Sequence, residues 1–254
     1  MVYFLFCVTS VNKTQRKEQK EGYCKKMKSV IRQLNAQEQE YYEKSLYPLQ
    51  DEVLDLFTEE RFYLTGGTCL SRFYFKHRYS EDLDFFFDGT LYSVNQFEID
   101  YLKLVSKIKV SNEIEITVAG EHFKRLFIKK KDVTLKIEFI YEPYPRIDKV
   151  RKLKNIFIDT KENIAVNKLT AVYTRKTAKD FFDLYFLLRE FDLTTLLKKT
   201  EIKIIPPAYE DLIISLRNTF FEGEVLTSQE INEREFINFV KQLIHNLLEY
   251  AKRI

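Results

Sequence analysis

The chain has 254 residues, of which 31% are charged and 45% hydrophobic, as is ordinary for a soluble globular protein with a real core. Only six glycines and five prolines are present, which argues against long flexible linkers. The net charge of +3, from 41 basic and 38 acidic residues, is too near balance to indicate nucleic-acid binding. Any basic surface must therefore come from local clustering.

The cysteines and the N-terminus indicate a cytoplasmic protein. Cys7, Cys24 and Cys69 are odd in number and lack metal-ligand spacing, so we expect free thiols in a reducing compartment. The first twelve residues are apolar but too short to span a bilayer, and no basic segment precedes them. We therefore expect neither a membrane span nor a secretory signal, and we treat residues 1–27 as an extension.

The first half of the chain alternates between helical and strand-like patterns. Residues 29–57 have broadly helical spacing, with a break at Pro48. Further helices are predicted at 67–76 and 92–109. Strands are predicted at 62–65, 83–88, Ile114–Val118, Phe123–Ile128 and Val133–Ile140. This order predicts roughly five strands in a mixed sheet, with flanking helices.

The second half is predicted to be helical. Pro143 and Pro145 mark a boundary, which divides the chain into an α/β domain at 28–145 and a helical domain at 146–254. The helices expected beyond residue 160 are Lys161–Thr174, Thr177–Phe191, Leu193–Lys199, Ala208–Leu216 and Ser228–Arg253.

The stretch from Phe62 to Gly89 carries the main chemical signal. A strand leads into Gly66–Gly67, which opens a helix whose free N–H groups and dipole suit a phosphate, with the Thr68 hydroxyl as a further donor. Asp82 and Asp84 follow at the start of the next strand, where residues two apart face the same side. Two converging carboxylates call for a counter-charge, usually a divalent cation. A glycine pair alone would indicate only a tight turn.

Glu138 is a candidate third carboxylate. It lies within a predicted strand between the apolar residues Ile137 and Phe139, so it would face a cleft or an edge. Together with Asp82 and Asp84 it could hold two Mg²⁺ or Mn²⁺ ions for phosphoryl transfer. The alternative is that the two aspartates start a turn and a strand, and that Glu138 is a salt-bridge partner.

A basic and acidic segment of the helical half could complete this site. Lys168 and Arg175 lie seven residues apart on one helical face, and Lys179 follows. Asp180 and Asp183 share a face three residues apart. The basic groups could bind a triphosphate that a metal partly neutralises. The alternative is a solvated helix with pairs such as Lys179–Asp183.

The runs LTGGTCLSRFYFKHRYSEDLDFF and NKLTAVYTRKTAKDFFDLYFLL resemble the AbiEii/AbiGii toxin family of nucleotidyltransferases, which belongs to the DNA polymerase β-like superfamily and includes the MenA-type toxins. The resemblance covers roughly residues 28–250. It implies an α+β fold: a nucleotidyltransferase mixed sheet with flanking helices, followed by a C-terminal helical bundle.

The resemblance also implies roles for individual residues. The nucleotide would be bound by Gly66, Gly67, Thr68, Ser80, Lys168, Arg175 and Lys179. The metal ligands would be Asp82 and Asp84, with Glu138 where the superfamily more often has Asp. The catalytic set would be Asp82, Asp84, Lys168 and Asp183, the last within a pattern that begins at Lys179 and Asp180.

The function that follows is a Mg²⁺-dependent nucleotidyltransferase toxin of a bacterial toxin–antitoxin or phage-defence system. It would transfer a nucleoside monophosphate from an NTP to an acceptor hydroxyl, with the tRNA 3′ end as the main candidate, and a cognate antitoxin would neutralise it. A small molecule or a protein as acceptor, and a catalytically silent binding module, remain alternatives. Basic residues that could form a surface for tRNA are Lys76, His77, Arg78, Lys149, Arg151, Lys152 and Lys154.

Overall fold

The computed structural model describes residues 31–253, apart from 176, 204–209, 212–215 and 217–222. The extension at 1–27, with Cys7 and Cys24, lies outside the described residues, and so does most of the helix predicted at 208–216.

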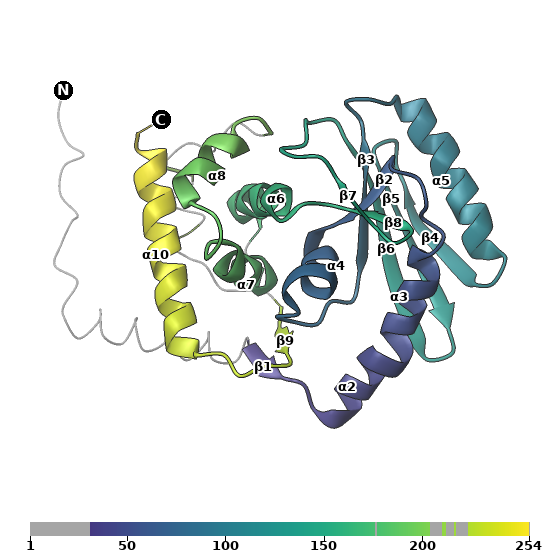
Figure 1. Ribbon diagram of the computed structural model, residues 1–254, viewed down its shortest axis with the longest axis horizontal. Helices are drawn as coiled ribbons and strands as arrows, with labels where there is room; N and C mark the ends of the chain where they lie inside the picture. Colours follow the sequence, from purple (N-terminus) through teal and green to yellow (C-terminus); the bar gives the residue numbers. More distant parts are fainter. Residues whose placement is uncertain (1–30, 176, 204–209, 212–215, 217–222, 254) are drawn as a thin grey trace, which may run out of the picture.

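A seven-stranded mixed sheet forms the centre of the first half, with the strand order β4-β5-β6-β3-β2-β8-β7 (Figure 1). Its strands are β2 (Phe62–Thr65), β3 (Leu83–Asp88), β4 (Glu113–Ala119), β5 (Phe123–Lys130), β6 (Val133–Glu142), β7 (Arg151–Leu153) and β8 (Ile156–Ile158). The mixed sheet confirms the predicted fold class. It has two more strands than expected, because β7 and β8 follow residue 146 and still join the sheet through β2.

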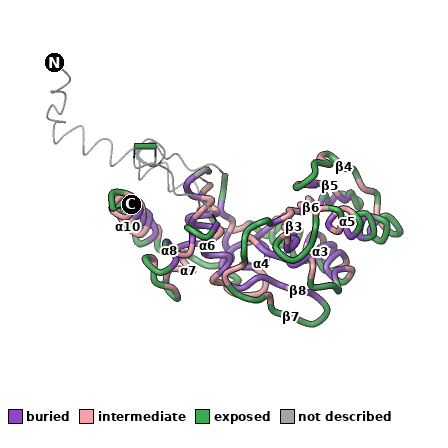
Figure 2. Tube along the Cα trace, turned by 90° about the horizontal axis from the view of Figure 1, so that it is seen from above, coloured by how far each residue is buried: buried purple, intermediate pink, exposed green. Residues whose placement is uncertain are grey.

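Helices cover both faces of this sheet. α3 (Tyr47–Leu54) and α5 (Val94–Lys109) lie on one side, and α4 (Gly66–Leu70) lies on the other (Figure 1). Alternation along the strands turns Phe85, Phe87 and Phe139 toward α5, where they meet Phe57 and Phe97. Figure 2 shows buried residues along the strands and the neighbouring helices. The opposite face of the sheet carries the carboxylates of Asp84 and Glu138.

The N-terminal helix differs from the prediction at Pro48. Asn35 and Glu38 form a capping box at α2 (Ala36–Tyr41), and the helix then continues through the π-helical segment η1 (Tyr42–Leu46) into α3. Pro48 lies in the first turn of α3, beside the π-helical segment, where the shifted hydrogen-bonding pattern tolerates the missing N–H. The predicted break is therefore wrong.

Helices dominate the chain after β8. They are α6 (Lys161–Thr174), α7 (Ala178–Leu187), α8 (Leu193–Thr200) and α10 (Glu233–Ala251). α6 packs against α7 and α8, α10 packs against α7, and α6 also contacts α4, which links these helices to the sheet. A second, two-stranded sheet, which we did not predict, pairs β1 (Ile31–Gln33) with β9 (Val225–Thr227) in parallel. Within the described part of the chain, no helix combines the length and the apolar character needed to cross a bilayer.

Candidate active site

The glycine turn brings the backbone against two charged side chains. β2 ends at Thr65, which pairs with Asp84 across the antiparallel ladder. Gly66 has a φ of +68°, and a Cβ atom there would lie 2.6 Å from Asp84 Oδ2. A Cβ atom on Gly67 would collide with the Arg78 guanidinium. Both positions therefore require glycine, the first for its backbone conformation and both for the close approach.

The three predicted carboxylates lie on the adjacent strands β3 and β6 and on the segment that leads into β3. β3 and β6 run parallel with Asp84 opposite Glu138, and Asp82 precedes Asp84 by two residues. Burial, together with the charges of Glu138 and Asp82, raises the pKa of Asp84 to about 6. Such mutual repulsion is what a bound cation relieves, and an all-oxygen donor set suits Mg²⁺ or Mn²⁺. The residue types therefore fit the predicted metal.

Two basic side chains already occupy this cluster. Lys136 Nζ lies 2.8 Å from Asp82 Oδ2 and 3.3 Å from Glu138 Oε1, and Arg125 donates to Glu138 Oε1 at 2.7 Å. Among the residues that the structure describes, no three His, Cys, Asp or Glu side chains are grouped as a metal site. Two of the three carboxylates, Asp82 and Glu138, are thus paired with the ammonium group of Lys136.

A cavity of about 330 Å³ opens beside Asp84 and Glu138 and separates the sheet from α6. Its apolar wall consists of Phe86, Phe123, Ile140, Ile164 and Ala171. Polar and glycine positions complete the lining: Thr65, Gly66, Gly67, Asp84, Glu138, Glu142, Asn167, Lys168, Thr170 and Arg175. The volume lies at the lower end of the range for small-molecule sites.

The cavity brings together only some of the predicted residues. Gly66, Gly67, Asp84, Glu138, Lys168 and Arg175 line it, whereas Thr68, Ser80, Asp82, Lys179 and Asp183 do not. Thr68 and Ser80 are buried, and the Thr68 hydroxyl lies 2.8 Å from Ser80 Oγ and close to the Asp82 carbonyl oxygen. These hydroxyls connect the start of α4 to the chain before β3. We expected both to face the nucleotide, but neither lines the cavity.

Lys168 and Asp183 belong to a buried ion cluster behind the cavity. Lys168 Nζ lies 2.7 Å from both Asp180 Oδ1 and Asp183 Oδ2. Arg78 donates to both oxygens of Asp183, at 2.7 and 2.9 Å, and His77 Nε2 lies 2.8 Å from Oδ1. Burial opposes ionisation of Asp183, but Arg78 and Lys168 outweigh it and hold its pKa well below its usual range.

This geometry gives Asp183 a positioning role. Its side chain is fully buried, and its oxygens are used by three basic groups. Arg78, which it holds, lies against Gly67. Asp183 therefore connects α7 to the glycine turn through Arg78, and its place in the catalytic set stays a prediction. Among the described residues Asp183 is paired with His77, Arg78 and Lys168, and not with Lys179 as the alternative of a solvated helix would have it.

Arg175 is the more accessible of the two basic residues in the cavity. Its guanidinium donates to both oxygens of Asp180, at 2.8 and 3.1 Å, while its side chain is 58% exposed. Lys168 is buried beside the same carboxylate, and the charges of Asp183 and Asp180 outweigh its burial and raise its pKa. Lys168 is therefore charged at neutral pH.

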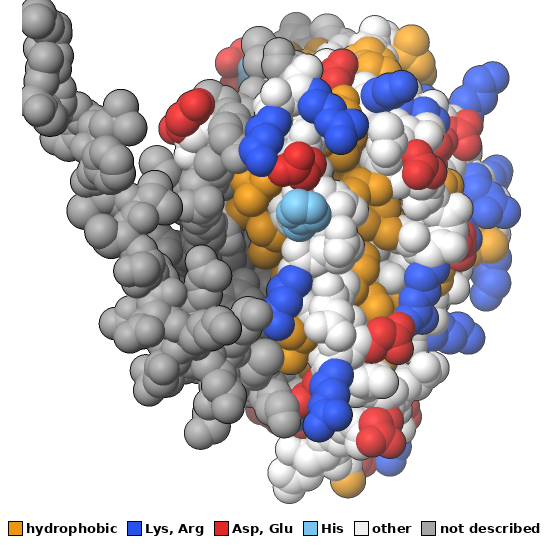
Figure 3. Space-filling view, turned by 90° about the vertical axis from the view of Figure 1, so that its left-hand side faces the viewer, with side chains coloured by type: hydrophobic (Ala, Val, Ile, Leu, Met, Phe, Trp, Pro, Cys, Tyr) orange, Lys and Arg blue, Asp and Glu red, His pale blue; other side chains and the backbone are white. Residues whose placement is uncertain are grey.

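The predicted basic surface is only partly present. His77 and Arg78 are buried, so they cannot contribute to it, and that part of the prediction is wrong. Lys76, Lys149 and Lys154 are exposed, as are Arg151 and Lys152 on the edge strand β7. On the side of the molecule where α10 lies, positive and negative side chains are mixed over the part in colour (Figure 3).

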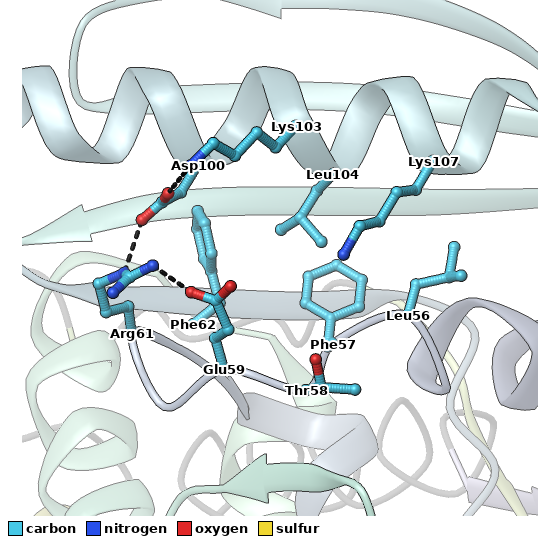
Figure 4. A pocket seen from close by; sticks show the side chains of 10 residues that line it. All are labelled: Leu56, Phe57, Thr58, Glu59, Arg61, Phe62, Asp100, Lys103, Leu104 and Lys107. Carbon is cyan, nitrogen blue, oxygen red and sulfur yellow. Dashed lines mark hydrogen bonds and ion pairs between the residues drawn. The ribbon is translucent and has the colours of Figure 1, made fainter.

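A second, smaller cavity lies on the opposite face of the sheet, between α5 and the segment before β2 (Figure 4). Its volume is about 40 Å³, roughly the room of one water molecule. Arg61 there donates to Asp100 at 2.7 Å and is also paired with Glu59, so its charge is already satisfied. This second cavity is too small for a nucleotide.

Our sequence reasoning missed Lys136 and Arg125. Lys136 precedes Glu138 by two residues on β6 and therefore shares its face, a relation that strand alternation could have revealed. Arg125 lies opposite Glu138 on β5, which only the strand pairing discloses.

Comparisons with known proteins show the family of the chain and the likeness of its fold. A protein-family model described as "Nucleotidyl transferase AbiEii toxin, Type IV TA system" matches residues 49–244. An uncharacterized protein of Aquifex aeolicus is 30% identical over 232 residues, which cover 86% of this chain and all of that protein.

Solved structures share the fold. JHP933 from Helicobacter pylori has a TM-score of 0.53 at 21% identity, covering 83% of this chain and 93% of its own. MenT4, a nucleotidyltransferase toxin of Mycobacterium tuberculosis H37Rv, has a TM-score of 0.51 at 16% identity, covering 81% and 92%.

Proposed function

Because the chain belongs to the AbiEii nucleotidyl transferase toxin family, we propose that this nucleotidyltransferase attaches a nucleoside monophosphate to the 3′ end of tRNA, with Mg²⁺ as its metal. Family membership implies an NTP substrate and a cognate antitoxin. We further propose that it acts in the cytoplasm, within a phage-defence or toxin–antitoxin locus.

One observation carries the proposal. Asp84 and Glu138, paired across β3 and β6, face the same cavity as the glycine turn and Lys168. Acidic groups for a metal and basic groups for a phosphate chain thus lie on opposite sides of one space. Nucleotide transfer needs this combination, because catalysis of phosphoryl transfer is mostly positioning and charge neutralisation.

Each part of the cavity has a proposed task. The nucleoside lies against Phe86 and Ile140, and the triphosphate extends toward the glycine turn, Lys168 and Arg175. Asp82, Asp84 and Glu138 would hold Mg²⁺, which supplies charge neutralisation and a more acidic acceptor hydroxyl when bound. The acceptor oxygen forms a bond to the α-phosphorus, the bond to the β-phosphate oxygen breaks, and pyrophosphate leaves.

The exposed basic residues of β7 support an RNA acceptor. Arg151 and Lys152 are exposed at the sheet edge, with Lys149 and Lys154 on either side. Arg151 pairs in register with Ile158, which itself pairs with Leu64 next to the glycine turn. A phosphate backbone bound along β7 could therefore lead its 3′ end toward the cavity.

The test uses purified protein, Mg²⁺, total tRNA and each of the four NTPs in turn, labelled either at the α- or at the γ-phosphate. We expect tRNA to acquire the α-label only, and an Asp84→Asn variant of intact fold to transfer none. Labelling of the protein itself, or of a small molecule with tRNA unlabelled, would assign a different acceptor. Equal transfer by wild type and Asp84→Asn would refute the site assignment.

A further inference from the structure

Lys136 lies between two carboxylates of the candidate metal site. Its ammonium group lies within 3.3 Å of an oxygen of Asp82, on the segment before β3, and of an oxygen of Glu138, on β6. Only 28% of its side chain is exposed.

The charges of the cluster nearly balance without any metal. Asp82, Asp84 and Glu138 carry three negative charges when ionised, and Arg125 and Lys136 supply two positive ones. Asp84 lines the cavity together with Glu138, but only Glu138 has ion pairs within 4 Å among the described residues, with Arg125 and Lys136. The one negative charge that is not balanced thus lies at Asp84, beside the cavity.

We propose that Lys136 is the resident counter-ion of this cluster: its ammonium group occupies the space between Asp82 and Glu138 and competes there with a divalent cation. The inference rests on the proposed function only in taking the cluster as the metal site. Lys136 must move aside for Asp82 and Glu138 to turn toward a shared ion with Asp84. Without a cation among them, the three ionised carboxylates would repel one another, and they would also repel the triphosphate of the substrate.

The chemistry of lysine suits a displaceable counter-ion. An ammonium group is a point charge on a flexible four-carbon stem, so it can leave without disturbing the strand. Arginine would instead bind a carboxylate through a planar fork with two parallel hydrogen bonds, and it would leave less readily. Arg125, which contacts only Glu138 in this cluster, fits the role of the permanent partner.

The experiment measures Mn²⁺ binding to the nucleotide-free protein by electron paramagnetic resonance or calorimetry, so that no catalytic step is involved. The variants are Lys136→Met, which removes the charge and keeps much of the stem, and Lys136→Arg. The control is Lys129→Met, because Lys129 lies on β5 of the same sheet and pairs with Glu115 at 2.6 Å. Folding of each variant is checked by its thermal melt, and Lys136→Gln serves as a second neutral variant.

We expect Lys136→Met to bind Mn²⁺ about tenfold tighter than wild type, because one unit of positive charge next to a dication is removed. Lys136→Arg should bind it more weakly, and Lys129→Met should be unchanged. If both neutral variants bind Mn²⁺ no tighter than wild type while Asp84→Asn abolishes binding, the counter-ion role is overturned and the metal site stands. If Asp84→Asn binds Mn²⁺ like wild type, the metal assignment itself fails, and the inference with it.

Discussion

The buried ion cluster around Asp183 leads to a quantitative stability prediction. Replacing Asp183 with Asn keeps the shape of the side chain and removes its charge. Lys168 would retain Asp180 at 2.7 Å, and Arg78 would keep hydrogen bonds to the amide oxygen of the new side chain and, at 3.0 Å, to the Tyr79 carbonyl oxygen. A buried guanidinium would thus lose its paired carboxylate, and Asp180 would be the remaining nearby negative charge.

The expected loss follows from that unpaired charge. Removing one partner of a buried ion pair typically costs about 3–5 kcal/mol. For a domain of 150–250 residues, each kcal/mol corresponds to roughly 2–4 °C in Tm, so we expect a decrease of about 6–20 °C. The assay is urea denaturation at pH 7, with the m-value checked for two-state behaviour. Glu40→Gln, which breaks the exposed Lys44–Glu40 pair, is the control and should lie within error of wild type.

The same variant separates a positioning role from a catalytic one. If Asp183 fixes Arg78, a double variant with Arg78→Met should be more stable than Asp183→Asn alone, because no unpaired charge remains. An Asp183→Asn protein that loses less than about 1 kcal/mol of stability and yet has no transferase activity would contradict the reasoning, since the carboxylate would then act on the substrate.

Three further predictions follow from the site. Asp84→Asn should abolish nucleotide transfer and leave Tm unchanged or raised. The raised pKa of Asp84 indicates that its ionised form is disfavoured in the folded protein, so losing the charge should not destabilise it. A lower Tm would mean that the charge of Asp84 stabilises the fold. Gly66→Ala should lower the unfolding free energy by roughly 1–3 kcal/mol, since it combines a left-handed φ with a clash against Asp84, and a urea titration that detects no loss would refute this. Burial lowers the pKa of His77 below its ordinary 6.5, so in mildly acidic solution the unfolded chain takes up a proton that the folded chain does not. The unfolding free energy should therefore fall as the pH drops through about 6.5, and it should fall less in His77→Gln. Identical pH profiles for the two proteins would exclude His77 as the cause.

Local sequence rules predicted the elements that depend on neighbouring residues. The helix at 161–174 was placed at its observed bounds from its helical spacing, and the structure shows that the Thr160 side chain caps its start. The β2–glycine turn–α4 unit follows from the conformational freedom of glycine, whereas the pairing of Asp84 with Glu138 depends on β3 and β6 being neighbours in the sheet. The functional roles of these residues stay predictions.

Local sequence rules could not predict which charged groups pair with one another. We expected His77 and Arg78 on the surface, yet both are buried, and Arg78 pairs with a residue 105 positions further along the chain. Lys136 and Arg125 neutralise the carboxylates only because β5, β6 and β3 are neighbours in the sheet.

The sequence by itself thus determined the family, the mixed sheet, the glycine turn and the identity of the three carboxylates, because each of these is encoded in short-range spacing. Only the tertiary structure decided which charges are buried, which face the cavity and which are neutralised. The physical reason is that desolvation and ion pairing depend on which segments pack together, and these segments are far apart in the sequence, as Arg78 and Asp183 are.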